Sequence, residues 1–393
     1  MTPAKHGRVG PMVARDDDSP WLDVDALLAD PATGIIVCCG SGGVGKTTTS
    51  AALALRAAER GRKVVVLTID PARRLAQSMG IEKLDNVPRP VPDVDGTAGG
   101  SLDAMMLDMK RTFDEVVESQ ASPEKAAQIL TNPFYVALST SFAGTQEYMA
   151  MEKLGQLQAD ARRTGRWDLI VVDTPPSRSA LDFLDSPERL SSFLDGRFIR
   201  LLLAPAKGPA RLMTAGLGLI TTALTKVLGA QVLRDLQTFV AAVDTLFGGF
   251  RQRAQKTFAL LQADGTAFLV VAAPEPDALR EAAYFVERLN EERMPLAGLV
   301  VNRASRAPGG RVSVERTLAA AERLEEDGTE GPTAGLLRLH ADRTRIVARE
   351  SRLRSRFATA HPDVPTAVVP ALSTDVHDLD GLRVVGDLLS RRP

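Results

Sequence analysis

The chain has 393 residues, 44% of them hydrophobic and 25% charged, a balance that excludes a disordered or low-complexity protein and allows a sizeable buried core. Its formal net charge of −1 excludes a strong overall attraction to nucleic acid or to anionic lipid. Cys38 and Cys39, the two cysteines, are adjacent, which excludes a disulfide framework and a CxxC metal clip.

Residues 1–30 are expected to form a flexible N-terminal tail followed by a short helix. Met1 to about Pro20 is polar and interrupted by proline and glycine, which is typical of disorder. Trp21 to Leu28 can form a short helix that packs on the domain behind it. Because no signal peptide is recognisable at the N-terminus, we expect a cytoplasmic protein.

A strand, a glycine-rich loop and a helix are predicted between Gly34 and Gly61. Residues 34–39 are apolar and β-branched, which indicates a buried strand. Residues 48–60 are rich in alanine and leucine and stop at a glycine, which indicates a helix. The segment between them fits G-x-x-x-x-G-K-[ST], the phosphate-binding loop. Its candidate nucleotide-binding residues are Gly40, Ser41, Gly42, Gly43, Val44, Gly45, Lys46, Thr47 and Thr48.

The residue types of this loop suit a nucleoside triphosphate. Glycines let successive backbone N–H groups point at phosphate oxygens, and the following helix adds the positive end of its dipole. Lys46 can reach the β- and γ-phosphates, and the Thr47 hydroxyl can bind Mg²⁺. A glycine-rich turn that merely joins strand to helix would explain the glycines but not the Lys-Thr pair.

Two aspartates follow predicted buried strands. Residues 63–68 form a strand that leads to Asp70, and residues 169–172 form one that ends in Asp173. Carboxyl ends of strands in an open α/β sheet line the ligand crevice, so both carboxylates are candidate Mg²⁺ ligands together with Thr47. Lys46, Asp70 and Asp173 are the candidate catalytic residues. For Asp70, an ordinary Asp-Pro turn is an equally good interpretation.

Two helical insertions are expected, at about residues 110–165 and 188–262. The uncharged stretch Leu212 to Thr225 is shorter than the ~20 residues that a membrane span needs. It is either ordinary helical core or an exposed surface. We therefore expect no integral membrane span, and residues 198–250 are a candidate surface for a hydrophobic client.

The C-terminal third continues the alternation of strands and helices. Strands are expected at 266–273, 296–303 and 365–369, and helices at 278–293, 314–326, 340–357 and up to Leu389. Asn302 and Arg303 end one strand, where an amide can bind the adenine edge. Ser305 stands where the N-K-x-D pattern has aspartate, which disfavours GTP. The arginines of 340–357 alternate with acids, which indicates a solvated face, and no nucleic acid partner is expected.

This alternation predicts an α/β fold with a mostly parallel, doubly wound sheet and one P-loop domain over residues 31–393. The motifs together resemble the ArsA-type ATPases, which include arsenite-pump ATPases and the targeting factor for tail-anchored membrane proteins. The matching segments are Cys39–Thr48, Asp70-Pro71-Ala72, the segment from Asp173 to Leu184, Val271–Glu275, Asn302, and Pro370–Leu382.

The resemblance implies a cytoplasmic ATPase that sandwiches Mg-ATP in a dimer. Asp70 would position the attacking water, Lys46 and Thr47 would hold phosphate and Mg²⁺, and Asp173 would act in the metal's outer shell. The segment that begins Pro370, Ala371 and Leu372 would close over the base.

Three departures from the family pattern qualify this implication. Ser41 stands in place of the lysine that reaches the partner's phosphates, so turnover as a homodimer should be slow, or another cation or a lysine-bearing ArsA-like paralogue should supply the charge. Arg178-Ser179 replaces a Gly-His pair. Two adjacent cysteines cannot supply three soft ligands, which argues against arsenite export. The alternatives are a degenerate regulatory subunit of a heteromeric complex and a ParA/MinD-like positioning ATPase.

Overall fold

The computed structural model describes residues 19–70, 74–81, 84–141, 145–175, 249, 252–309, 312–326 and 332–392. Two expected features lie outside the described residues: the segment that carries Arg178, and the candidate client surface at 198–250 except for Gly249. Most of the second expected insertion lies outside them as well. The same holds for residues 1–18 of the expected tail.

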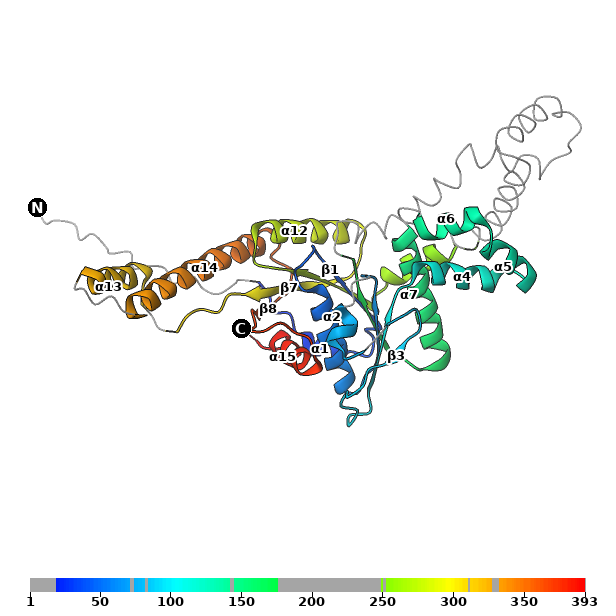
Figure 1. Cartoon of the computed structure of the whole chain (residues 1–393), viewed down its shortest axis with the longest axis horizontal. Coiled ribbons are helices and arrows are strands. Elements are labelled where there is room, and N and C mark those ends of the chain that lie inside the picture. The colour runs from blue at the N-terminus through cyan, green and yellow to red at the C-terminus, as the bar shows by residue number, and fades with distance from the viewer. Residues whose placement is uncertain are drawn as a thin grey trace, which may run out of the picture.

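An eight-stranded sheet forms the centre of the described part, in the order β3-β4-β2-β5-β1-β6-β7-β8 (Figure 1). All neighbouring strands run parallel except β3, which pairs antiparallel with β4. The strands are β1 (Ile35–Cys39), β2 (Lys63–Thr68), β3 (Arg89–Pro90), β4 (Ser101–Met106), β5 (Leu169–Asp173), β6 (Thr266–Ala272), β7 (Leu296–Ala304) and β8 (Thr366–Pro370). The predicted mostly parallel α/β sheet is therefore confirmed.

Helices cover both faces of this sheet. Side chains of alternate residues in β1 point into two separate hydrophobic clusters, as expected for a strand buried on both faces. One cluster includes helices α1 (Val24–Ala29), α2 (Lys46–Glu59), α3 (Arg74–Ser78) and α15 (Leu379–Leu389). The other includes α4 (Met109–Gln120), α5 (Pro123–Leu130), α6 (Pro133–Ser141), α7 (Thr145–Thr164) and α12 (Pro276–Glu291).

Helix α2 is buried between the sheet and α15. It is rich in alanine, and both Leu53 and Leu55 have no more than 1% of their surface exposed. Small side chains allow such close packing at little loss of side-chain entropy. The helix begins directly at Lys46, so this packing fixes the end of the glycine-rich loop against the sheet.

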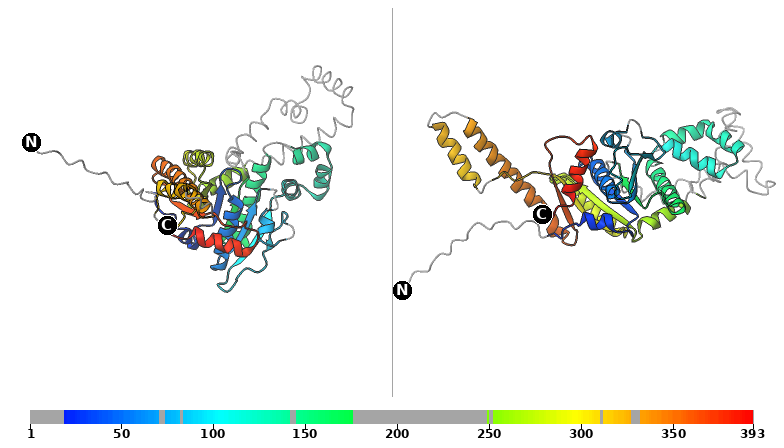
Figure 2. Two further views of the ribbon diagram at one scale, coloured as in Figure 1. Left: turned by 60° about the vertical axis from the view of Figure 1, so that its left-hand side comes forward. Right: turned by 90° about the horizontal axis from the view of Figure 1, so that it is seen from below.

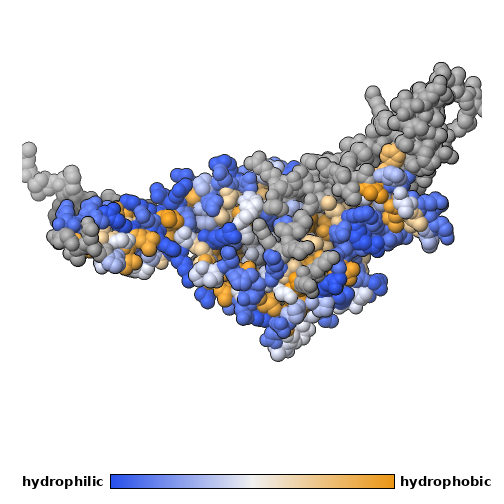
Figure 3. Space-filling model, viewed as in Figure 1, coloured by the Kyte–Doolittle hydropathy of each residue, from blue (hydrophilic) through white to orange (hydrophobic). Residues whose placement is uncertain are grey.

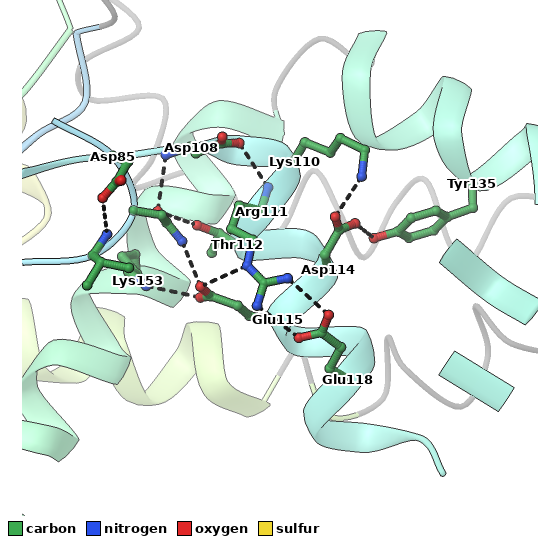
Figure 4. A network of polar contacts seen from close by, with 12 residues as sticks. Asp85, Asp108, Lys110, Arg111, Thr112, Asp114, Glu115, Glu118, Tyr135 and Lys153 are labelled. Atoms are coloured by element: carbon green, nitrogen blue, oxygen red, sulfur yellow. Dashed lines mark hydrogen bonds and ion pairs between the residues drawn. The ribbon is translucent and has the colours of Figure 1, made fainter. Parts of the chain in front are cut away.

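A polar network joins α4 to the loop before β3 and to α7 (Figure 4). The Glu115 carboxylate accepts hydrogen bonds from the Asn86 amide at 3.1 Å and from the Lys153 ammonium at 3.0 Å. Asn86 is buried, and its oxygen accepts from the Asp108 backbone N–H and the Thr112 hydroxyl. Because buried polar groups need partners, this network fixes how the helical layer sits on the sheet.

Helices α13 (Val314–Glu326) and α14 (Pro332–Ala360) form a hairpin that projects from the sheet (Figures 1 and 2). The 29 residues of α14 give a length of about 43 Å at 1.5 Å per residue. The helix begins eight residues before the predicted position 340. These eight residues form about two turns and include Leu336 and Leu339, which are 64% and 57% exposed. Figure 3 shows apolar patches among charged ones along the hairpin.

Helices in the described ranges are all too short or too polar to cross a membrane. In the segment before α4, the short strand β3 pairs with β4 through Arg89 opposite Ala104 and Pro90 opposite Asp103.

Candidate nucleotide-binding site

A pocket of about 820 Å³ lies at the carboxyl ends of the strands, within the size range of small-molecule sites. It brings together residues from the glycine-rich loop and the first turn of α2, the segment after β2, the end of β7, the end of β8 with the segment after it, and α15. The lining residues are Gly43, Gly45, Lys46, Thr47, Thr48, Asp70, Asn302, Arg303, Val369, Pro370, Ala371, Leu372, Thr374, Asp375, Val376 and Val385. Most of the predicted site residues therefore share one cavity; Gly40, Ser41, Gly42, Val44 and Asp173 are not in its wall.

The conformation of the glycine-rich loop depends on its glycines. Gly40, Gly43 and Gly45 have φ angles of 146°, 77° and 95°, in the region that side chains disfavour. A Cβ on Gly40 would lie 2.1 Å from the Val271 carbonyl oxygen, and one on Gly45 would lie 2.2 Å from the Asn302 amide nitrogen. At positions 40 and 45, β6 and β7 thus leave no space for a Cβ in the observed arrangement.

Lys46 is almost fully buried at the start of α2. Its ammonium donates a hydrogen bond to the Ser41 carbonyl oxygen at 2.8 Å, across the loop. Burial lowers the pKa of Lys46, and the nearby Asp173 carboxylate opposes that shift. The ammonium therefore lies at the loop, where an anionic group entering the pocket would meet it.

Asp173 lies behind the pocket wall and is completely buried. One carboxylate oxygen accepts hydrogen bonds from the hydroxyls of Thr47 and Thr68, each at 2.8 Å. The other oxygen, Oδ1, is buried without a hydrogen-bond partner among the described residues. Burial raises the pKa of Asp173 to about 6, and the two threonine hydroxyls oppose that shift.

These groups fit a hydrated Mg²⁺ ion. A hard cation prefers oxygen ligands and keeps several waters, and Thr47 offers a hydroxyl in the pocket wall. The unpartnered oxygen of Asp173 can accept a hydrogen bond from such a water. Among the described residues, no group of three or more His, Cys, Asp or Glu side chains forms a separate metal cluster.

Asp70 lines the same pocket at the end of β2. Its backbone N–H donates to the Thr68 hydroxyl at 3.2 Å, and that hydroxyl in turn donates to Asp173. Thr68 therefore connects the two aspartates, a role that the sequence prediction missed. The available signal was its position as the last residue of the strand before Asp70.

Asn302 and Arg303 lie in the pocket wall and also bind the glycine-rich loop. The Asn302 amide donates to the Val44 carbonyl oxygen, and the Arg303 guanidinium donates to the Gly43 carbonyl oxygen, both at 2.8 Å. The predicted contact of Asn302 with adenine remains a prediction. Pro370, the last residue of β8, and Ala371 and Leu372 directly after it also line the pocket.

Comparison with known proteins assigns the chain to a family. The sequence model of the anion-transporting ATPase family matches residues 33–308, which include the whole glycine-rich loop and both aspartates. The chain belongs to this family. The predicted ArsA-type resemblance is thereby confirmed, and an ATPase activity is the general property that the family indicates.

Several curated relatives are similar over part of the chain. The arsenical pump-driving ATPase of Acidiphilium multivorum is 31% identical over 40% of this chain and 26% of its own length. The ATPase GET3 of Malassezia globosa is 29% identical over 45% of this chain and 50% of its own. The ATPase ASNA1 homolog of Cryptosporidium parvum is 26% identical over 67% of this chain and 63% of its own. The match thus spans less than two thirds of each relative.

Replacing Asp173 by asparagine is expected to stabilise the nucleotide-free protein at pH 8. A buried carboxyl whose folded pKa is about 6, above the ordinary 3.8, destabilises the fold when it is ionised. That penalty is fully present above pH 6 and disappears as the pH falls from about 6 to about 4. A shift of this size corresponds to about 3 kcal/mol, so urea unfolding should show a gain of that order at pH 8 that shrinks toward pH 4.

The exposed Asp363→Asn is the matched control, because it removes a carboxylate without changing a buried one. Its free energy of unfolding should stay within about 0.5 kcal/mol of wild type at both pH values. An Asp173→Asn variant that is less stable than wild type at pH 8 would contradict the burial argument.

Proposed function

We propose that the chain binds Mg-ATP in the pocket at the strand ends and hydrolyses it. The observation that carries this proposal is the buried Asp173 carboxylate, which accepts from Thr47 and Thr68 and keeps one oxygen unpartnered among the described groups, beside Lys46. A glycine-rich turn that merely joined strand to helix would not need a buried carboxylate beside it, because burying a charged group costs free energy.

Each residue has a proposed role. Backbone N–H groups from Gly40 to Thr48 and the Lys46 ammonium hold the phosphates. Thr47, Asp173 and Asp70 hold Mg²⁺ and its waters, and when bound the ion neutralises charge on the phosphate oxygens. Asp70 orients the attacking water from the pocket wall. Pro370, Ala371 and Leu372 surround the base. Asn302 and Arg303 contribute to nucleotide binding by holding the glycine-rich loop through the Val44 and Gly43 carbonyl oxygens.

We further propose that the protein works as a dimer and couples its nucleotide state to a partner or client. The support for a dimer is the family to which the chain belongs. Ser41, which leaves the loop without a second lysine, motivates a partner that supplies the missing charge. Pairing with a lysine-bearing paralogue is the main alternative to a homodimer. The proposed client surface at 198–250 lies outside the described residues.

Arsenite is not the proposed ligand, although one relative is named an arsenical pump-driving ATPase. Arsenite needs soft sulfur ligands, and both cysteines of the chain are completely buried in β1. Burial raises the pKa of the Cys38 thiol to about 12, so it stays protonated and unreactive.

Calorimetric titration of the purified chain with ATP and Mg²⁺ tests the binding step. We expect wild type to bind ATP more tightly than GTP, and Lys46→Ala to weaken ATP binding by about 100-fold, because the variant loses charge-assisted hydrogen bonds to phosphate. Lys63→Ala is the matched control, since Lys63 is exposed at the start of β2. A folded wild-type chain that binds no ATP would refute the proposed function.

A further inference from the structure

The end of β7 carries a bulge that faces the glycine-rich loop. The pairing of β7 with β8 shifts register between Val301 and Ala304, which leaves Asn302 and Arg303 outside the regular ladder. Arg303 has a φ of 61°, a left-handed conformation that is unusual for a residue other than glycine. Bulges of this kind often re-aim side chains beside functional sites.

Consecutive residues from 302 to 304 contact both sides of the pocket. Asn302 and Arg303 donate to the Val44 and Gly43 carbonyl oxygens at 2.8 Å each. The Ala304 carbonyl oxygen accepts from the Ala371 backbone N–H, also at 2.8 Å. The bulge therefore bridges the loop expected to bind phosphate and the segment expected to cover the base.

The next residue ties the bulge to α14. The Glu350 carboxylate accepts two hydrogen bonds from Ser305, one from its backbone N–H and one from its hydroxyl, each at 2.7 Å. Both residues are half-buried. Glu350 itself is absent from the pocket wall, so it touches no ligand there. Bonds to an ionised acceptor are stronger than neutral ones, which makes this pair a firm anchor.

We propose that Glu350 is a positioning residue for nucleotide binding. By holding Ser305, it keeps the bulge in the shape from which Asn302 and Arg303 reach the loop carbonyls. A non-glycine residue in a left-handed conformation persists only where its surroundings fix it. Ser305 lies two residues after Arg303, and its two hydrogen bonds to Glu350 hold that end of the bulge.

The effect of Glu350 is on the phosphate part of the ligand. Arg303 and Asn302 engage the Gly43 and Val44 carbonyl oxygens, which fixes the orientation of these two peptide groups in the loop. The loop can then present its N–H groups to an anion. This inference rests on the proposed function, because it concerns the same nucleotide pocket.

Competition against a fluorescent ATP analogue tests the inference, with ATP, inorganic tripolyphosphate and adenosine as competitors. Glu350→Ala should weaken ATP and tripolyphosphate by about tenfold each and leave adenosine within about twofold, because one anchored charge-assisted contact is lost. Steady-state turnover should show a raised KM with kcat nearly unchanged. Glu350→Gln should stay within about threefold of wild type, since its amide can still bind both groups of Ser305.

Asp342→Ala is the control on the same helix, because Asp342 is exposed and contacts Arg345 on α14 itself. It should leave all three competitors unchanged. Ser305→Ala keeps the backbone contact and tests the same link if Glu350→Ala folds poorly; it should weaken tripolyphosphate by about threefold. Unchanged tripolyphosphate affinity in both Glu350→Ala and Ser305→Ala, or an equal loss for adenosine, would overturn the inference.

A double-mutant cycle with Arg303→Ala gives an independent result. If Glu350 acts through the bulge, adding Glu350→Ala to Arg303→Ala should weaken tripolyphosphate by clearly less than the roughly tenfold expected in the wild-type background, because only the Asn302 contact is left to lose, whereas two independent effects would multiply. Multiplying effects would contradict the inference. If wild type binds ATP and Glu350→Ala has unchanged tripolyphosphate affinity, only this inference is rejected. If wild type binds no ATP, the proposed function is rejected and the inference with it.

Discussion

Asp70→Asn should lose about 10²–10⁴-fold in the rate of ATP turnover while ATP affinity changes by less than about threefold. Asp70 lies in the pocket wall at the end of β2, and Thr68 links its backbone to the buried Asp173. Asparagine keeps the size and the backbone contact but cannot orient water as a charged acceptor. The loss should therefore fall on kcat, measured by phosphate release, and not on binding.

Asp375→Asn is the matched control for Asp70→Asn. Asp375 also lines the pocket, but it follows β8 on the wall expected to face the base. Its kcat should stay within about threefold of wild type if the charge at position 70 acts specifically. A turnover rate of Asp70→Asn equal to wild type would remove Asp70 from the proposed mechanism and leave the alternative that it only forms an Asp-Pro turn.

Ser41→Lys should raise ATP turnover, by at least about tenfold, in a manner that depends on protein concentration. A cation at the transferring phosphate is worth ~10³–10⁵ in rate where an arginine finger supplies it. Serine has neither the charge nor the reach, and here the Ser41 carbonyl oxygen binds Lys46. Ser41→Gln adds length without charge and should leave the rate near that of wild type.

No gain in Ser41→Lys would show that the chain obtains its cation elsewhere or needs none. Sedimentation velocity on the same samples separates the explanations, because a trans cation can act only in a dimer. A gain in a sample that stays monomeric would contradict the proposed dimeric arrangement.

The strands were the most predictable part of this protein. The β2 strand and helix α13 have the predicted bounds, and the parallel sheet follows from apolar runs that alternate with helices. The glycine-rich loop between β1 and α2 was also predictable from its glycines. Positions 40 and 45 have no space for a Cβ in the observed arrangement, so the glycines there mark the loop in the sequence. Local sequence therefore determined both the fold class and the centre of the candidate site.

The contacts around the site could not be predicted in the same way. Thr68 and Glu350 act through partners 105 and 45 residues away along the chain, and no local pattern marks such pairs. The bulge at Asn302 and Arg303 depends on the register between β7 and β8. The start of α14 was predicted too late. Its first turns expose Leu336 and Leu339, so the apolar residues there do not follow the amphipathic pattern by which helices are predicted.

The most direct test of the central claim is steady-state ATP turnover by the purified wild-type chain with Mg²⁺, with Asp70→Asn measured in parallel. We predict slow but measurable phosphate release by wild type, which stops when Mg²⁺ is chelated. We predict no measurable phosphate release by Asp70→Asn. Phosphate release that is absent from wild type, or equal in the two proteins, would contradict the assignment of this pocket as an ATP-hydrolysing site.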